Sequence, residues 1–300
     1  MSPYTQGQVL TLAVSGCPVE GDLNGDGIPD LLAASGSSSG TAVAFLGNGD
    51  GTFTQVVQTT PMSTTGLLAL GDFNGDGKLD WASSSNLLAL GNGDGTFQTP
   101  APYIQGYTPG SIFGIAAARL NGKRESDIVL TSPSSNLVYV LLSTGTGFQQ
   151  TTFSVFNEPA NCDAPTIPVL ADVNGDGKPD LVLECGLGPV VPIFLNNGEG
   201  QFTYSTGLFV TLSDGDAFPV VADVNGDGIA DIVLIAGSDL DIFLGEGSMM
   251  FEYVASLGTL GSPQQIFALS AHGQNPKLGL RDLVVPDGSG VLDVILNTTK

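Results

Sequence analysis

The sequence predicts an all-β fold built from six repeats of about 50 residues, and three observations support this prediction. First, 42 glycines and 18 prolines divide the chain into short apolar runs, which is typical of short strands joined by turns. Second, an Asp-rich loop of nine residues recurs along the chain. Third, a glycine-rich turn follows most of these loops in step with the repeat.

The Asp-rich loop has the pattern Asp-x-Asn-Gly-Asp-Gly-x-x-Asp. Its four intact copies span residues 22–30, 72–80, 172–180 and 223–231. A degenerate copy at residues 119–127 has Arg119 and Lys123 where acidic residues stand elsewhere, and a second remnant ends near Asp282. Six units therefore occupy the whole chain.

The glycine-rich turn lies between an apolar residue and a phenylalanine. Its Asn-Gly or Asp-Gly centre is a hairpin signal. The turns span residues 46–53, 90–97, 142–148, 195–202 and 244–251. Each unit is then interpreted as a strand, the Asp-rich loop, a second strand that begins at the last Asp, a variable loop, a third strand, the turn and a fourth strand. Four antiparallel strands in about 50 residues are typical of one blade of a β-propeller.

The two ends of the chain predict closure. Residues 8–14 have the pattern of a fourth strand, whereas the last unit stops after residues 291–296 without one. We expect the N-terminal strand to complete the last blade, because a closed ring leaves no free strand edges. The prediction is one domain, residues 1–300, that forms a six-bladed propeller of four-stranded antiparallel blades.

The composition limits the partners. The formal net charge is −22, so an anionic partner such as nucleic acid is electrostatically disfavoured. No apolar run reaches the roughly 18 to 20 residues that span a bilayer, so we expect no membrane insertion. Residues 1–4 lack the basic segment followed by an apolar one that is typical of a signal peptide, so we expect none in the given sequence. For the three cysteines, Cys17, Cys162 and Cys185, a bridge between Cys162 and Cys185 and free thiols are both open.

The Asp-rich loops have the donor chemistry of Ca²⁺ sites. Ca²⁺ takes about six to eight oxygen ligands, and glycines let a short loop curve around it. Positions 1, 3, 5 and 9 offer side-chain oxygens, and position 7 offers a carbonyl. The four predicted sites are Asp22, Asn24, Asp26, Ile28 and Asp30; Asp72, Asn74, Asp76, Lys78 and Asp80; Asp172, Asn174, Asp176, Lys178 and Asp180; and Asp223, Asn225, Asp227, Ile229 and Asp231.

The loops lack the Glu that EF-hands carry at their twelfth position, so position 9 is expected to bind the ion directly. The alternative is a set of metal-free Asp/Asn/Gly turns. We expect the two degenerate loops to be empty. Our hypothesis for residues 119–127 is that Lys123 replaces the ion and pairs with Asp127.

In these motifs the chain resembles the FG-GAP/VCBS repeat proteins, a family related in pattern to the integrin α-subunit propeller and to propeller lectins. The resemblance covers essentially all 300 residues. It implies an extracellular or cell-surface propeller that is stabilised by calcium and serves adhesion or ligand recognition. Seven blades, which are frequent in the family, are the alternative to six.

The ligand is expected on variable loops opposite the Asp-rich loops, because strands alternate in direction. The candidate ligand-binding residues are Tyr103, Tyr107, Asp214 and Asp216, although such aromatic residues can also pack their own loop. The sequence has no GxSxG or HExxH motif, so we predict no catalytic residues. We expect a monomer that binds a carbohydrate or protein ligand. A structural repeat domain and a calcium-dependent polysaccharide-processing enzyme are the alternatives.

Overall fold

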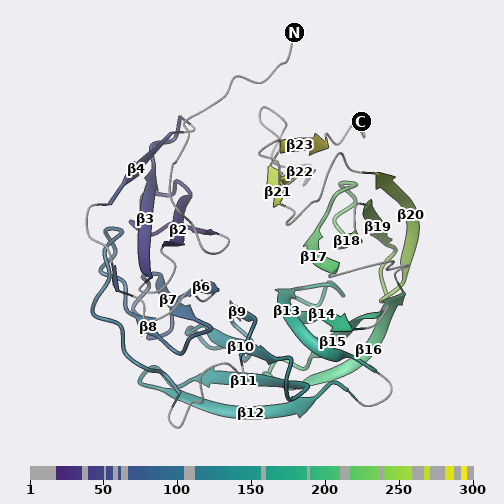
Figure 1. The fold of residues 1–300 in the computed structure, drawn as a ribbon, viewed down its shortest axis with the longest axis horizontal. Helices are drawn as coiled ribbons and strands as arrows, with labels where there is room; N and C mark the ends of the chain where they lie inside the picture. The colour runs from purple at the N-terminus through teal and green to yellow at the C-terminus, as the bar shows by residue number, and fades with distance from the viewer. Residues whose placement is uncertain are drawn as a thin grey trace. The chain divides into compact units, whose positions relative to one another are not determined.

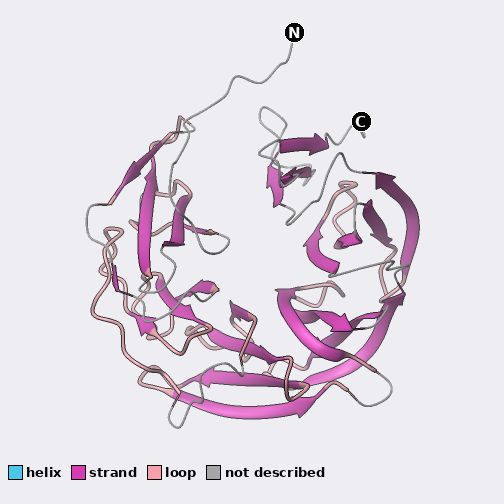
Figure 2. Ribbon diagram, viewed as in Figure 1, coloured by secondary structure: helices cyan, strands magenta, loops and turns pink. Residues whose placement is uncertain are grey.

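The structure is a computed structural model (Figure 1). It describes residues 18–35, 40–50, 52–56, 60–61, 67–104, 112–156, 160–187, 190–209, 217–236, 239–258, 267–270, 281–286 and 292–295. Within these ranges the regular elements are strands joined by loops, with no helix (Figure 2). No described segment forms a helix with the length and apolarity needed to span a membrane.

The described strands form six antiparallel sheets, each built from neighbours in the chain (Figure 1). The first contains β1 (Val19–Gly21), β2 (Asp30–Ser35), β3 (Thr41–Gly47), β4 (Phe53–Gln55) and β5 (Thr60–Pro61). The second contains β6 (Leu68–Gly71), β7 (Asp80–Ser83) and β8 (Leu88–Ala89). The third contains β9 (Ile115–Ala118), β10 (Asp127–Ser132), β11 (Leu137–Ser143) and β12 (Phe148–Ser154).

The remaining three sheets follow the same order. The fourth contains β13 (Asp163–Ala171), β14 (Asp180–Leu187), β15 (Val190–Asn196) and β16 (Phe202–Phe209). The fifth contains β17 (Ala217–Ala222), β18 (Asp231–Ala236), β19 (Asp239–Gly245) and β20 (Phe251–Gly258). The sixth contains β21 (Phe267–Ser270), β22 (Arg281–Pro286) and β23 (Leu292–Ile295).

The register matches the predicted unit. The last Asp of each intact loop begins the second strand of its sheet and pairs with the end of the first, as Gly21 with Asp30 and Ala171 with Asp180. The all-β, antiparallel prediction is therefore confirmed. Residues 8–14 lie outside the described residues, so closure and the number of blades stay predictions.

The chain divides into two compact units: residues 1–130 with 139–151, and residues 131–138 with 152–300. The first holds a core around Leu32, Trp81 and Phe97 and another around Phe73 and Ile128. The core of the second is centred on side chains from β14, β15 and β18. The expectation of one domain remains a prediction.

A disulfide joins Cys162 and Cys185 within the second unit. Cys162 lies just before β13, and Cys185 lies on β14 opposite Pro165. Of the two alternatives that the sequence left open for this pair, the structure contains the bridge. Cys17 lies outside the described residues.

Candidate metal-binding loops

The four intact loops share one backbone conformation. In the first, Gly25 and Gly27 have φ angles of 77° and 82°. Residues with a Cβ rarely adopt such values, so glycine is required at positions 4 and 6. The equivalent glycines of the other loops also have positive φ: Gly75, Gly77, Gly175, Gly177, Gly226 and Gly228. The sequence pattern thus encodes a tight curve with its N–H groups turned inward.

The first Asp of each loop accepts hydrogen bonds from these glycines. Asp22 accepts the Gly25 N–H on Oδ1 at 2.7 Å and the Gly27 N–H on Oδ2 at 2.9 Å. Asp72, Asp172 and Asp223 make the same pair of contacts. A carboxylate at position 1 therefore holds the loop closed.

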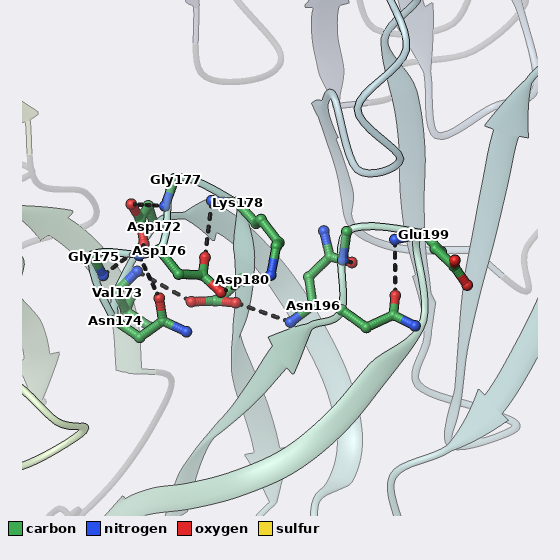
Figure 3. A network of polar contacts seen from close by, with 12 residues as sticks. Asp172, Val173, Asn174, Gly175, Asp176, Gly177, Lys178, Asp180, Asn196 and Glu199 are labelled. Atoms are coloured by element: carbon green, nitrogen blue, oxygen red, sulfur yellow. Dashed lines mark hydrogen bonds and ion pairs between the residues drawn. The ribbon is translucent and has the colours of Figure 1, made fainter.

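The side chains at positions 3 and 5 each close a smaller turn at the outer side of the loop, which we call its rim. Figure 3 shows this for residues 172–180. Asn174 Oδ1 accepts the Asp176 N–H at 2.8 Å, and Asp176 Oδ1 accepts the Lys178 N–H at 3.0 Å. The Lys178 Nζ atom also forms an ion pair with Asp176 Oδ2 at 3.0 Å. The pKa of Asp176 is lowered, mainly by its hydrogen bond from Lys178.

The last Asp of each loop connects the loop to the glycine-rich turn. Asp30 is fully buried; its Oδ2 accepts the Leu23 N–H at 2.7 Å and its Oδ1 accepts the Gly47 N–H at 2.8 Å. The same two contacts recur at Asp80, Asp180 and Asp231. Each position-9 carboxylate thus accepts one N–H from the start of its loop and one from the residue at or just after the end of the third strand. We call this pair of hydrogen bonds the bracket.

The degenerate loop keeps this bracket. Asp127 accepts the Leu120 N–H at 2.9 Å and the Ser143 N–H at 2.8 Å. The sequence analysis assigned position 9 only to metal binding and missed this role. The available signal was that Asp127 and Asp282 persist where the acidic residues at positions 1 and 5 are lost.

The hypothesis that Lys123 pairs with Asp127 is wrong. No ion pair joins these two described residues, and the third neighbour of the Asp127 carboxylate is Asn121 Nδ2 at 3.4 Å. The third sheet instead contacts the loop of residues 72–80 at two points. The Ser126 N–H of the degenerate loop donates to the Asp72 carbonyl at 2.7 Å, and Ser143 Oγ at the end of β11 donates to the Phe73 carbonyl at 2.7 Å. The N–H groups of Leu120 and Ser143, together with Asn121, therefore satisfy the Asp127 carboxylate, and Lys123 acts on its pKa only through its charge, without an ion pair.

Burial raises the pKa of four position-9 carboxyls, those of Asp80, Asp127, Asp180 and Asp231. For Asp80 the loss of solvent raises the pKa to about 6, although the N–H groups of Gly91 and Phe73 oppose the shift. Burial also raises the pKa of Asp127, Asp180 and Asp231, again against two or more backbone N–H groups. The protein thus holds carboxylates at sites where negative charge is costly.

The loop residues have the donor types of a Ca²⁺ site, namely carboxylates, an amide oxygen and a carbonyl. In the first loop Asp22 and Asn24 are partly exposed and Asp26 is exposed. Across the described ranges, however, no three acidic, histidine or cysteine side chains converge as a ready metal cluster. Their oxygens accept loop N–H groups instead. An ion would be held by positions 1, 3 and 5 after these side chains turn toward it, while direct binding by the position-9 carboxylate and the position-7 carbonyl stays a prediction.

Of the candidate ligand-binding residues, the structure describes only Tyr103. Its hydroxyl donates to the Ser83 carbonyl at 2.8 Å, and its ring meets the Phe148 ring edge-on at a centroid distance of 5.8 Å. Tyr103 lines a groove of about 780 Å³ together with Asn74 of an intact loop. This differs from the expected placement of the two on opposite faces. Tyr107, Asp214 and Asp216 lie outside the described residues.

Comparison with solved structures identifies β-propellers. An Agrocybe aegerita lectin that recognises non-reducing terminal N-acetylglucosamine is 22% identical, with a TM-score of 0.56 over 81% of this chain and 66% of the lectin. The Pseudomonas aeruginosa periplasmic gluconolactonase PpgL is 14% identical, with a TM-score of 0.57 over 88% of this chain and 77% of the enzyme. At these identities the likeness shows the fold alone.

A third similar structure is the Photorhabdus luminescens Tc holotoxin pore, at 24% identity and a TM-score of 0.53. The match covers 89% of this chain, which spans only 13% of the toxin chain. No curated protein matches the sequence. The sequence model of the FG-GAP-like repeat matches three times, at residues 22–83, 119–183 and 190–234, which is more than half of the 300 residues. The matched segments contain all four intact loops, and the chain belongs to the FG-GAP-like repeat family.

Proposed function

We propose that this chain is a calcium-stabilised, extracytoplasmic β-propeller that acts as a non-catalytic recognition module for a carbohydrate or protein ligand. The observation that carries the proposal is the fourfold recurrence of one loop geometry, in which an exposed carboxylate at position 5 and a partly exposed amide at position 3 form a rim beside a buried bracket. Four such rims concentrate part of the acidic charge of a chain whose formal net charge is −22. Bound divalent cations would relieve that repulsion.

The disulfide supports the location. Bridges between buried cysteines persist in oxidising compartments and are rare in the cytosol. Cys162 is fully buried and Cys185 is 4% exposed, so the bond is part of the packed interior of the second unit. A secreted or cell-surface protein would keep this bond.

Six described sheets, one for each sequence repeat, support a propeller of six blades. In this proposal residues 8–14 complete the sixth blade. Removing residues 1–14 would then leave an open edge, and such edges promote association between chains. Light scattering of the shortened chain and of the full chain compares their tendency to associate. Equal behaviour of the two chains would argue for another arrangement.

Fold alone does not separate binding from catalysis, because a lectin and a gluconolactonase share it. The test is a glycan array probed with the full chain in calcium and in EDTA, beside a pull-down of surface proteins. Saturable binding that competes with free ligand supports recognition. Depolymerisation of a polysaccharide, or no ligand in either assay, would contradict the proposal.

A further inference from the structure

The groove that contains Tyr103 lies in the first unit, where two repeat motifs meet an irregular edge of the second sheet. It runs between β8, residues 98–104, the loop of residues 72–80 and the turn that joins β11 to β12. The second sheet has three strands, and residues 97–101 add only isolated pairs, Gly91 with Phe97 and Leu88 with Ala101. Pro100 and Pro102 cannot donate to a strand ladder, which explains why a regular fourth strand is absent here.

Three aromatic rings form one continuous wall of the groove. Phe148 stands between the other two, with its centroid 6.1 Å from Phe73 and 5.8 Å from Tyr103, both edge-to-face. The bond from the Tyr103 hydroxyl to Ser83 fixes its ring. Because the aromatic rings of this wall are already ordered, a ligand that stacks on them binds at a lower entropic cost.

The rim of the groove carries amides and hydroxyls but no charge. Gln98, Thr99 and Gln150 are exposed on it, and Asn74 is partly buried. None of the lining residues is acidic or basic, although the chain as a whole carries 30 acidic residues. Side-chain amides both donate and accept hydrogen bonds, as sugar hydroxyls do. The groove therefore suits a ligand that is neutral, polar at its edge and apolar on one face.

From these features we propose that this groove binds a neutral oligosaccharide, stacked on Phe148 and Tyr103 and hydrogen-bonded by Gln98 and Gln150. The inference rests on the proposed recognition function. The volume of about 780 Å³ lies within the roughly 300 to 1,000 Å³ of small-ligand sites. A proline-rich peptide also suits aromatic grooves, but it offers carbonyl acceptors and no N–H at proline, so the acceptor oxygens of the rim amides favour a sugar.

The experiment compares two neighbouring glutamines of β12. Gln150 lines the groove, whereas Gln149 is also exposed but is not among the lining residues, as alternation along a strand requires. The full chain and the variants Gln98→Ala/Gln150→Ala and Gln149→Ala are titrated calorimetrically with neutral tri- and tetrasaccharides of glucose, mannose, xylose and N-acetylglucosamine, and with decaproline. Circular dichroism melts check that the variants remain folded.

We expect the full chain to bind one of the oligosaccharides, the double variant to bind it about tenfold or more weakly, and Gln149→Ala to bind it normally. If the double variant still binds the sugar normally, the sugar site is not this groove, and the recognition function stands. Binding of decaproline and of no oligosaccharide would contradict the proposed sugar ligand but not the proposed recognition function. Protein capture with no sugar bound also overturns only the inference, whereas no ligand in any assay overturns both.

Discussion

Asp127 shows most clearly what a single residue contributes to this fold. It is buried in a loop that has lost its other acidic positions, and it still accepts the N–H groups of Leu120 and Ser143. Its role in that loop therefore does not depend on a cation. The same carboxylate geometry at Asp30, Asp80, Asp180 and Asp231 makes the bracket a property of the repeat itself.

Replacing Asp127 with Asn should lower the free energy of unfolding by about 1–3 kcal/mol. An amide has one acceptor oxygen, so one of the two buried N–H groups would face an NH₂ group instead. Urea unfolding measures the change. The control is Lys123→Ala, which removes an exposed side chain without an ion pair and should cost less than about 0.5 kcal/mol. If the two variants unfold alike, the bracket contributes little.

The raised carboxyl pKa values predict a pH dependence for the calcium-free protein. The native state binds the Asp80 proton more tightly than the unfolded chain, whose pKa is near 3.8. This contribution to stability is complete below that value and is lost as the pH rises through about 6. Asp127, Asp180 and Asp231 act in the same direction. The lowered pKa values of Asp50, Asp94 and Asp176 act below 3.8, outside this window.

In EDTA the melting temperature should therefore fall by a few degrees between pH 5 and pH 7. Thermal melts followed by circular dichroism at four or five pH values give the answer. In calcium the fall should shrink or reverse, because a bound cation favours the ionised carboxylates. A melting temperature that rises steadily over this range in EDTA would show that burial of these groups does not govern stability.

At the scale of the elements, the disulfide fastens β14 to the segment that precedes β13. It closes a loop of 23 residues, for which chain-entropy arguments give about 3 kcal/mol. The double variant Cys162→Ala/Cys185→Ala should lose a stability of that order in urea unfolding. Wild-type protein with its disulfide reduced should fall to the same midpoint. An unchanged midpoint in both samples would mean that the bond does not constrain the unfolded chain.

The sequence predicted the elements well where the repeat is regular. The last Asp of each intact loop begins a second strand, because an apolar run follows a tight Asp/Gly turn in every unit. Two features were not predicted. The bracket was missed because a sequence displays the carboxyl groups but not the distant N–H groups that reach them. The irregular edge of the second sheet was not predicted although Pro100 and Pro102 lie there, because the recurring motifs led us to expect four strands in every unit.

At the scale of the whole molecule, repulsion among the acidic residues works against the compact folded state. Thirty acidic residues against eight basic ones give −22, and four divalent ions would bring the formal charge to −14. Each ion would also link positions 1, 3 and 5 of a loop above the bracket. Ligands that bind only the folded state stabilise it by mass action. Calcium should therefore raise the stability of both units, since intact loops occur in each.

The most direct test of this account is the calcium stoichiometry of the full chain, measured by equilibrium dialysis after removal of metal with EDTA. The account predicts four ions per chain, and a melting temperature that rises as they bind. The variants Asp76→Asn and Asp176→Asn should each remove one ion, whereas Lys123→Ala in the degenerate loop should remove none. A chain that binds no calcium at millimolar concentration, and melts alike with and without EDTA, would contradict the central claim.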